Sequence, residues 1–421
     1  MGIVTVVFLF VLYMINYVDK SIAGYSAEQI TEQMQLDPAQ WGMVGSSFYW
    51  LFAIAGVIGA GLSDRIGTKK VLLIMAVIWT VVQLGAYAIT SLPLLIVARM
   101  LLGAGEGPTW PVIVSHISKW FPEEKRGFIF ALLTFGASVG ASLFTPLLVR
   151  SIETAGWQTT WAILGSLSLV WFILWLFIGA ERPGSGLPER EAAVPAVPAE
   201  TKWSDVFATV LSANFACSFF IYFAQIWGVT FVLVWMPTYL VKVFHFTSAE
   251  MSSAVAVIGV VSGVITLATC ILADYLFRKT KRHRKSYVRV GGIAVTAGGV
   301  LFSLIPWVQS PSMLIAIFCA GLGLTVSAGS LVSVIGSTLL PARTGLIMGI
   351  MSGLVTIAGI VSPIVTGAIV KSAADDIALG FNQALLLNSG LYLVSGVLFY
   401  LLVKRKERDA SLSGEGLAKA N

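Results

Sequence analysis

The chain has 421 residues, of which 57% are hydrophobic and only 11% are charged. Soluble domains carry about 25% charged residues, so this composition excludes a soluble globular protein and predicts a membrane protein. The net charge of +6 therefore reflects how loops are placed around a bilayer, and it does not predict nucleic-acid binding.

The first apolar segment begins almost at the N-terminus, over residues 3–25. About 20 mostly apolar residues are enough to cross a bilayer. The segment has no basic leader and no small-residue cleavage site, so we expect it to be kept as the first span and not removed as a signal peptide. Five further stretches of this kind follow, at 41–62, 71–90, 92–114, 127–150 and 156–179.

The loop after the second span carries an ordered motif. It reads Gly61-Leu62-Ser63-Asp64-Arg65-Ile66-Gly67-Thr68-Lys69-Lys70. Gly67 permits a tight turn, Asp64 is suited to cap a neighbouring helix N-terminus, and the basic residues are suited to bridge helix ends. The order of residues resembles the signature loop of the major facilitator superfamily, although the glycine usual four residues before the aspartate is Ala60. The resemblance implies that Asp64, Arg65, Lys69 and Lys70 help to latch two halves together. The alternative is that they only mark the cytoplasmic side.

Four ionisable residues lie inside the spans of the first half. Asp19 and Lys20 are in the first span, and Arg99 and Glu106 are in the fourth. Charge inside a membrane is costly, so such residues are functional candidates. Arg99 and Glu106 share one helical face, about two turns apart.

Two cations and two carboxylates sum to zero when all four are ionised. Protonation of both carboxylates leaves a site of charge +2, which attracts an anion. Anion and protons would then bind with positive coupling, which is the basis of symport. Two alternatives stay open: ion pairs that only fix helix packing, and an Asp19–Lys20 pair at a helix end near the outer surface.

A segment rich in proline, glycine and charge follows at 181–203, and we expect an aqueous linker there. Six more apolar stretches come after it, at 212–240, 249–276, 286–308, 312–338, 342–370 and 381–403. Six spans, a linker and six spans are typical of a transporter built from two halves. The sequence thus predicts an all-α membrane protein with twelve transmembrane helices. Its halves are 1–180 and 204–403, joined by the linker and followed by a tail at 404–421.

The basic residues predict the orientation. Only Arg150, Lys242 and Lys371 fall on one side, whereas all other lysines and arginines outside the spans fall on the side of the linker and tail. The positive-inside rule places that side, and with it both termini, in the cytoplasm. In the second half, Ala273-Asp274-Tyr275 followed by Arg278 and Lys279 is a degenerate copy of the signature loop, so Asp274 is a further gating candidate.

A narrower resemblance rests on two long segments and two shorter ones. The shorter ones are Lys119-Trp120-Phe121-Pro122-Glu123 and Trp235-Met236-Pro237-Thr238-Tyr239. The long segments are Asn16-Tyr17-Val18-Asp19-Lys20 and Ala98-Arg99-Met100-Leu101-Leu102-Gly103-Ala104-Gly105-Glu106-Gly107-Pro108-Thr109-Trp110-Pro111. They are similar to the anion:cation symporter family, which includes bacterial sugar-acid/proton symporters. The resemblance implies that Asp19 and Glu106 carry protons, that Arg99 holds the substrate carboxylate or pairs with Glu106, and that Tyr17 lines the pocket.

Several pocket positions depart from the pattern of sugar-acid members. Lys20 stands for arginine, so a point charge replaces a bidentate fork. Other positions lose hydroxyl-reading groups: Phe52 stands for tyrosine, Ala137 for glutamine, Ser327 lies where Ser-x-Thr-Trp is usual, and Ser352 stands for asparagine. Sites without such groups discriminate poorly for hydroxyls. We therefore expect a less hydroxylated acid, with Trp50 as the most promising of the other aromatic side chains.

The sequence has no ATP-cradling loop and no nucleophile–base arrangement, so it predicts a transporter and not an enzyme. Cys217, Cys270 and Cys319 each lie in an apolar run, which predicts neither disulfide nor metal site, and no cofactor is expected. The expected partners are a small organic anion, protons and the lipid bilayer of a bacterial inner membrane. We expect the protein to be a monomer. An exporter or antiporter of metabolites or drugs on the same fold is the alternative, because direction is not written in the sequence.

Overall fold

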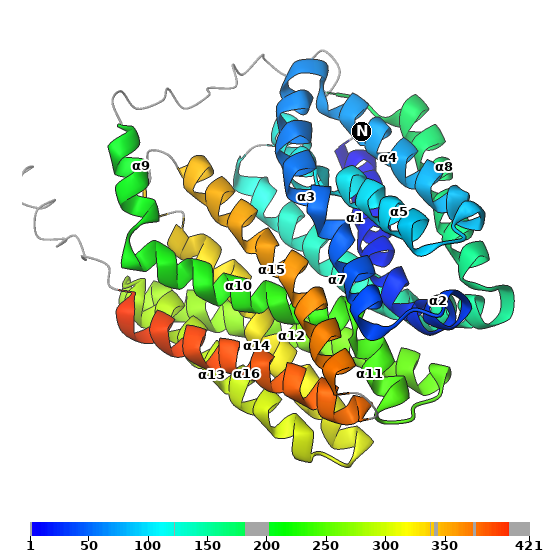
Figure 1. The fold of residues 1–421 in the computed structure, drawn as a ribbon. Helices are drawn as coiled ribbons and strands as arrows, with labels where there is room; N and C mark the ends of the chain where they lie inside the picture. Colours follow the sequence, from blue (N-terminus) through cyan, green and yellow to red (C-terminus); the bar gives the residue numbers. More distant parts are fainter. Residues whose placement is uncertain are drawn as a thin grey trace, which may run out of the picture.

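The computed structural model describes residues 2–121, 123–181, 202–336, 338–340, 344–373 and 376–403, and these residues are helical apart from short connections (Figure 1). Most of the predicted linker at 181–203 and the whole predicted tail at 404–421 lie outside the described residues. The helices up to the linker are α1 (Gly2–Tyr25), α2 (Ala27–Met34), α3 (Pro38–Ile66), α4 (Thr68–Leu84), η1 (Gly85–Ala88), α5 (Leu92–Glu106), α6 (Thr109–Trp120), α7 (Glu123–Ala155) and α8 (Trp157–Ile178). Those after it are α9 (Trp203–Val210), α10 (Ala213–Val234), α11 (Met236–Lys242), α12 (Ser248–Thr280), η2 (Arg284–Val288), α13 (Arg289–Leu304), η3 (Ile305–Trp307), α14 (Pro311–Gly336), α15 (Thr344–Ser372) and α16 (Ile377–Leu402).

Ten helical stretches of the described residues are long and apolar enough to cross a membrane. Large apolar side chains on their surfaces are exposed, such as Ile58, Leu147 and Phe177 at 64%, 63% and 79%. Such an apolar surface suits lipid and not water.

The predicted fourth span, 92–114, is divided in the structure. It is formed by α5 and α6, which are separated at Gly107 and Pro108. Pro108 has no backbone N–H and disfavours helical geometry in the residue before it, so a helix tends to break there. Neither piece is counted among the ten spans, and the number twelve stays a prediction.

The turn at Gly67 fixes how α3 meets α4. Gly67 has φ +94°, a left-handed conformation that side chains disfavour. At the other end of α3, the side chain of Asp37 accepts a hydrogen bond from the backbone N–H of Gln40, and Pro38 occupies the first helical turn. These are strong helix-start features. Between this start and the turn at Gly67, α3 forms one continuous helix of 29 residues.

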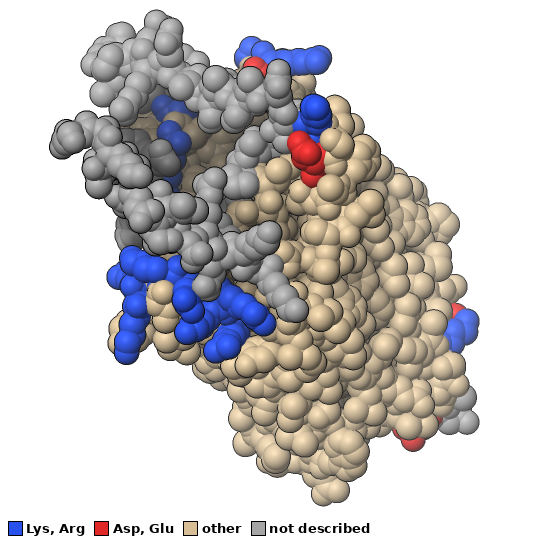
Figure 2. All heavy atoms as spheres, turned by 90° about the vertical axis from the view of Figure 1, so that its left-hand side faces the viewer, with Lys and Arg blue, Asp and Glu red and all other residues tan. Residues whose placement is uncertain are grey.

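The helices before the linker and those after it form two groups in Figure 1. They meet along two seams, where α3 lies beside α15 and α7 lies beside α12. We call the end that carries Arg65, Lys69, Lys70, Arg278 and Lys279 the basic end, and the opposite end the far end. Figure 2 shows lysine and arginine side chains gathered on one face of the molecule.

Ion pairs join the two groups at the far end. Lys242 of α11 lies 2.9 Å from a carboxylate oxygen of Glu28 and 3.7 Å from one of Glu32, both on α2. Lys371 of α15 lies 2.9 Å from Oδ2 of Asp37. Lys242 and Lys371 are two of the three basic residues that the sequence placed on this side, so these exceptions to the charge bias hold the two groups together.

Backbone contacts bring the two groups still closer at the far end. The Cα of Gly24 on α1 packs against the carbonyl group of Leu233 on α10, and the Cα of Gly42 on α3 packs against that of Pro363 on α15. The indole Nε1 of Trp41 donates to the carbonyl oxygen of Val234 at 3.3 Å. Small residues permit this kind of close helix approach, and the far end is closed.

Candidate functional site

The four charged residues predicted inside the spans lie together between α1 and α5. Asp19, Arg99 and Glu106 are 0%, 3% and 1% exposed. Asp19, Lys20 and Arg99 all act electrostatically on Glu106. The burial of Asp19 rules out the alternative of an exposed Asp19–Lys20 pair at a helix end, and the four residues form one cluster, which we call the charge cluster.

An amide connects two members of the charge cluster. The ammonium of Lys20 donates to Oδ1 of Asn16 at 2.7 Å, and Nδ2 of Asn16 donates to Oε2 of Glu106 at 2.9 Å. Lys20 Nζ itself is 3.9 Å from the same Oε2. Nδ2 of Asn16 also donates to Oγ1 of Thr109 at 3.3 Å, so residues of α1, α5 and α6 meet at the amide of Asn16.

Aromatic rings flank both cations. Lys20 Nζ lies 5.3 Å from the ring centre of Tyr17 and 5.4 Å from that of Phe52. The guanidinium of Arg99 lies 4.7 Å from the ring centre of Phe48. Contacts of this kind stabilise a cation by about 0.5–2 kcal/mol, depending on desolvation, but they leave the N–H donors free for other partners.

The charge cluster has unused hydrogen-bonding groups. Both oxygens of Asp19, Nε and Nη1 of Arg99, and Oε1 of Glu106 are buried and have no hydrogen-bond partner within the part of the chain that the structure describes. The amide of Gln83 on α4 lies beside Asp19 but also lacks a well-formed hydrogen bond. Buried polar groups without partners are costly, so the cluster is better suited to binding a polar ligand than to holding helices together.

The other predicted pocket residues lie in different settings. Tyr17 and Phe52 reach Lys20, whereas the indole of the half-buried Trp50 donates to Oγ of Ser46 at 2.8 Å. Ser327 is fully buried and donates to the carbonyl oxygen of Leu324 in its own helix at 2.6 Å. Ser352 on α15 is exposed. The side chain of Ala137 on α7 lies outside the described residues.

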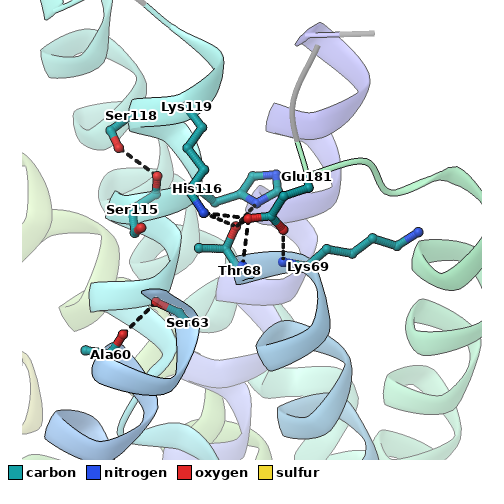
Figure 3. Close-up of polar contacts among 9 residues, drawn as sticks. All are labelled: Ala60, Ser63, Thr68, Lys69, Ser115, His116, Ser118, Lys119 and Glu181. Carbon is teal, nitrogen blue, oxygen red and sulfur yellow. Dashed lines mark hydrogen bonds and ion pairs between the residues drawn. The ribbon is translucent and has the colours of Figure 1, made fainter. Parts of the chain in front are cut away.

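The signature loop is organised by a residue that the sequence did not single out. Figure 3 shows Glu181, just after α8, against the start of α4. Its Oε1 accepts from the backbone N–H and the hydroxyl of Thr68, both at 2.9 Å, and from Lys119 at 2.5 Å, and its Oε2 accepts from the backbone N–H of Lys69 at 2.7 Å. Glu181 thus caps the N-terminus of α4, and the capping role expected of Asp64 stays a prediction.

Glu181 is held ionised by these contacts. Partial burial opposes its charge, but the hydrogen bonds from Lys119 and from the backbone of Lys69 and Thr68 outweigh burial and lower its pKa to about 2. Its carboxylate also fills the space where a side chain at Gly67 would lie, so glycine is required at that turn for room as well as for φ.

Replacement of Glu181 by glutamine is expected to destabilise the protein by about 1 kcal/mol, the cost of losing a helix cap. Because the folded-state pKa lies below the usual 4.5, the stabilisation is complete above that usual value and disappears as pH falls towards about 2. Thermal unfolding of both proteins in lipid across this pH range checks the prediction. Unfolding midpoints that differ equally at all pH values would contradict it.

Two of the gating candidates, Lys69 and Asp274, make local contacts. The ammonium of Lys69 donates to the carbonyl oxygen of Leu176 at 3.0 Å, and Asp64, Arg65 and Lys70 are exposed. Oδ1 of Asp274 accepts from the hydroxyl of Tyr287 in η2 at 2.8 Å. A latch through these residues between the two groups of helices stays a prediction.

Comparisons with known proteins find similar transporters. The chain is 28% identical over 399 residues to the hexuronate transporter of Bacillus subtilis (strain 168), covering 92% of this chain and 91% of that one. It is 28% identical over 422 residues to the D-galactonate transporter of Escherichia coli O6:H1, covering 95% of each. It is 27% identical over 304 residues to a probable sulfoacetate transporter of Cupriavidus necator, covering 69% of this chain and 67% of that one.

Solved structures share the fold at low sequence identity. A bacterial homologue of the human lysosomal transporter Spinster, in an inward-facing and unoccupied conformation, matches with a TM-score of 0.77 at 16% identity over 95% of this chain and 96% of that one. The D-xylose-proton symporter matches with a TM-score of 0.77 at 15% identity over 96% of this chain and 98% of that one. A profile of the Major Facilitator Superfamily matches residues 9–363. The chain is a multi-pass membrane transporter that belongs to the Major Facilitator Superfamily, and it is similar to transporters of sugar acids and other anions.

Proposed function

We propose that this protein is a symporter that imports a small organic anion together with protons across a bacterial inner membrane. The two six-helix halves predicted from the sequence rock about a central site and expose it to each side in turn. The basic end, with both termini, faces the cytoplasm. The closed far end then corresponds to a state that is shut towards the outside.

The observation that carries this proposal is the charge cluster with its unused hydrogen-bonding groups. With Asp19 and Glu106 ionised, the four charges balance and the helices can return empty. With both carboxyls protonated, Lys20 and Arg99 carry an uncompensated charge of +2, which a dianion such as sulfoacetate neutralises and a monoanion halves. Binding of each partner therefore favours binding of the other, and the anion lowers the cost of keeping the two cations inside the membrane.

The proposed substrate is a carboxylate or sulfonate with few hydroxyl groups. Lys20 lies between the rings of Tyr17 and Phe52, and Arg99 lies over Phe48, so the walls around both cations are mainly aromatic. The hydroxyl of Ser327 is already used within its own helix. One similar protein is named a probable sulfoacetate transporter, and sulfoacetate is a short acid without a hydroxyl group.

Uptake by the purified protein in liposomes tests the proposal, with D-galactonate, D-glucuronate, sulfoacetate and benzoate as labelled probes. We expect sulfoacetate or benzoate to be carried better than the two sugar acids, and uptake to increase when the outside is acidic. Uptake restricted to polyhydroxy acids would contradict the substrate class. Transport that is insensitive to the pH gradient, or that exchanges a bound anion for an outward-moving proton, would contradict symport and favour an antiporter.

Glu106→Gln separates the proton step from anion binding, because glutamine resembles a carboxyl group that never releases its proton. We expect net uptake driven by a pH gradient to be lost, whereas exchange of labelled for unlabelled anion continues. Arg150→Ala removes a cation away from the charge cluster and serves as the control. Net uptake by Glu106→Gln with its pH dependence intact would show that another group carries the proton.

A further inference from the structure

The hydrogen bonds around Asn16 fix which way its amide points. Lys20 has donors only, so the amide atom that faces its ammonium must be the oxygen Oδ1. The NH₂ group of Asn16 therefore faces Oε2 of Glu106 and Oγ1 of Thr109. The single hydroxyl hydrogen of Thr109 is already donated to the backbone oxygen of Glu106 at 2.6 Å, so Oγ1 accepts from Asn16, in agreement with this orientation.

This orientation makes the two oxygens of the Glu106 carboxyl group unequal. Oε2 accepts from Asn16 and lies 3.9 Å from the ammonium of Lys20, and both favour an oxygen without a hydrogen. Oε1 is buried and has no hydrogen-bond partner among the described residues. A proton on Oε1 leaves Oε2 as a carbonyl oxygen, which accepts hydrogen bonds better than a hydroxyl oxygen does.

We propose that Asn16 directs the transported proton to Oε1 of Glu106 and connects that carboxyl group to Lys20, so that an anion bound at Lys20 favours protonation of Glu106. Asn16 is then a positioning residue, because it acts through Glu106 and Lys20. The inference rests on the proposed function, since it concerns the route by which anion and proton affect each other.

The link to Lys20 supplies the coupling. In the empty site, the ammonium of Lys20 stabilises the ionised Glu106 both directly and through Asn16. An anion that pairs with Lys20 competes for this positive charge, so Glu106 is left with less support for its own negative charge and takes up a proton. The other charged or titratable groups near Glu106 are Asp19 of α1, Arg99 of α5 and Tyr49 of α3, and none of them hydrogen-bonds to Asn16 in the part of the chain that the structure describes.

Infrared difference spectroscopy of the full-length protein in lipid, titrated with acid and without added substrate, tests the proposal. The carbonyl band of protonated Glu106 is the band that Glu106→Gln lacks. In Asn16→Ala, we expect this band at a higher wavenumber, because its carbonyl oxygen has lost a hydrogen bond. The band is also expected to appear at a pH about one to two units higher, because the donor that favours the ionised form is gone.

The connection to Lys20 is tested by a double-mutant cycle with Lys20→Met, which retains the length but not the charge. A shift of the titration midpoint in the double variant that is smaller than the sum of the shifts in the two single variants supports the link. A shift equal to that sum contradicts it. Asn388→Ala, which removes a buried amide of α16 away from the charge cluster, is expected to leave the band unchanged. If Asn16→Ala leaves both wavenumber and midpoint unchanged, the role of Asn16 is wrong, although Glu106 still carries the proton. If the unmodified protein has no Glu106 band at all, the proposed function itself fails.

Discussion

Arg99→Ala is expected to raise the anion concentration needed for net uptake and for anion exchange strongly. The buried guanidinium of Arg99 has two nitrogens without hydrogen-bond partners among the described residues, and a bound carboxylate or sulfonate would accept from them. Loss of hydrogen bonds to a charged group costs about 3 kcal/mol for such a pair, or roughly a hundredfold in affinity. Half-saturation concentrations for uptake into liposomes, measured for both proteins with the best probe acid, check this prediction.

Stability measurements distinguish a binding role of Arg99 from a packing role. A buried cation with two unpartnered nitrogens is costly to the folded protein, so we expect Arg99→Ala to unfold at an equal or higher temperature. Arg99→Lys keeps the charge but not the fork that holds two oxygens at once, and it should retain partial uptake. Marked destabilisation of Arg99→Ala together with unchanged half-saturation would instead show that the residue mainly holds α5 in place.

Gly24→Ala and Gly42→Ala are expected to prevent closure of the far end and so to reduce uptake strongly. An added methyl group at either residue would meet the carbonyl oxygen of Leu233 or of Pro363 at less than any normal contact distance. These carbonyls belong to the opposite group of helices, so relief requires the two groups to separate by about 1 Å or more. Alanine favours helices over glycine by about 1 kcal/mol, and a loss of transport would therefore not arise from weaker helices.

Distances between spin labels at the exposed positions Gln35 and Ala249, one on each side of the far end, report on its closure. We expect longer distances in Gly24→Ala and Gly42→Ala than in the unmodified protein. Gly390→Ala is the matched control, because this helical glycine has open space where a methyl group would lie. Unchanged distances with normal uptake in both variants would mean that the closed far end is not a working state of the cycle.

The fold and the charge cluster were predictable because both depend on strong contrasts in the sequence. Long apolar runs stand out against charged loops, and Asp19, Lys20, Arg99 and Glu106 stand out because ionisable groups are rare inside apolar runs. The break at Gly107 and Pro108 was not part of the predicted span 92–114, although proline is a recognisable signal for the end of a helix.

Other parts of the site were not predictable, because their roles depend on partners far away in the chain. Glu181 accepts a hydrogen bond from the backbone N–H of Thr68, which lies 113 residues away in the sequence. The residues around Glu181 in the sequence resemble any charged linker. Asn16 was visible in a motif, but a neutral amide in an apolar run looks the same whether it packs or connects. The buried position of Ser327 likewise follows from how α14 is rotated, which single-residue differences from a family pattern do not reveal.

Asp37 divides its two oxygens between two tasks at the far end. Oδ1 accepts from the backbone N–H of Gln40, and Oδ2 accepts from Lys371 across the seam. The hydrogen bond from the backbone of Gln40 has the larger effect and the pair with Lys371 the next larger, and both lower the pKa of Asp37 below its usual range. The pair with Lys371 therefore keeps its charge in solutions acidic enough to protonate an ordinary aspartate side chain, so we expect acidification to leave this contact between the two groups of helices intact.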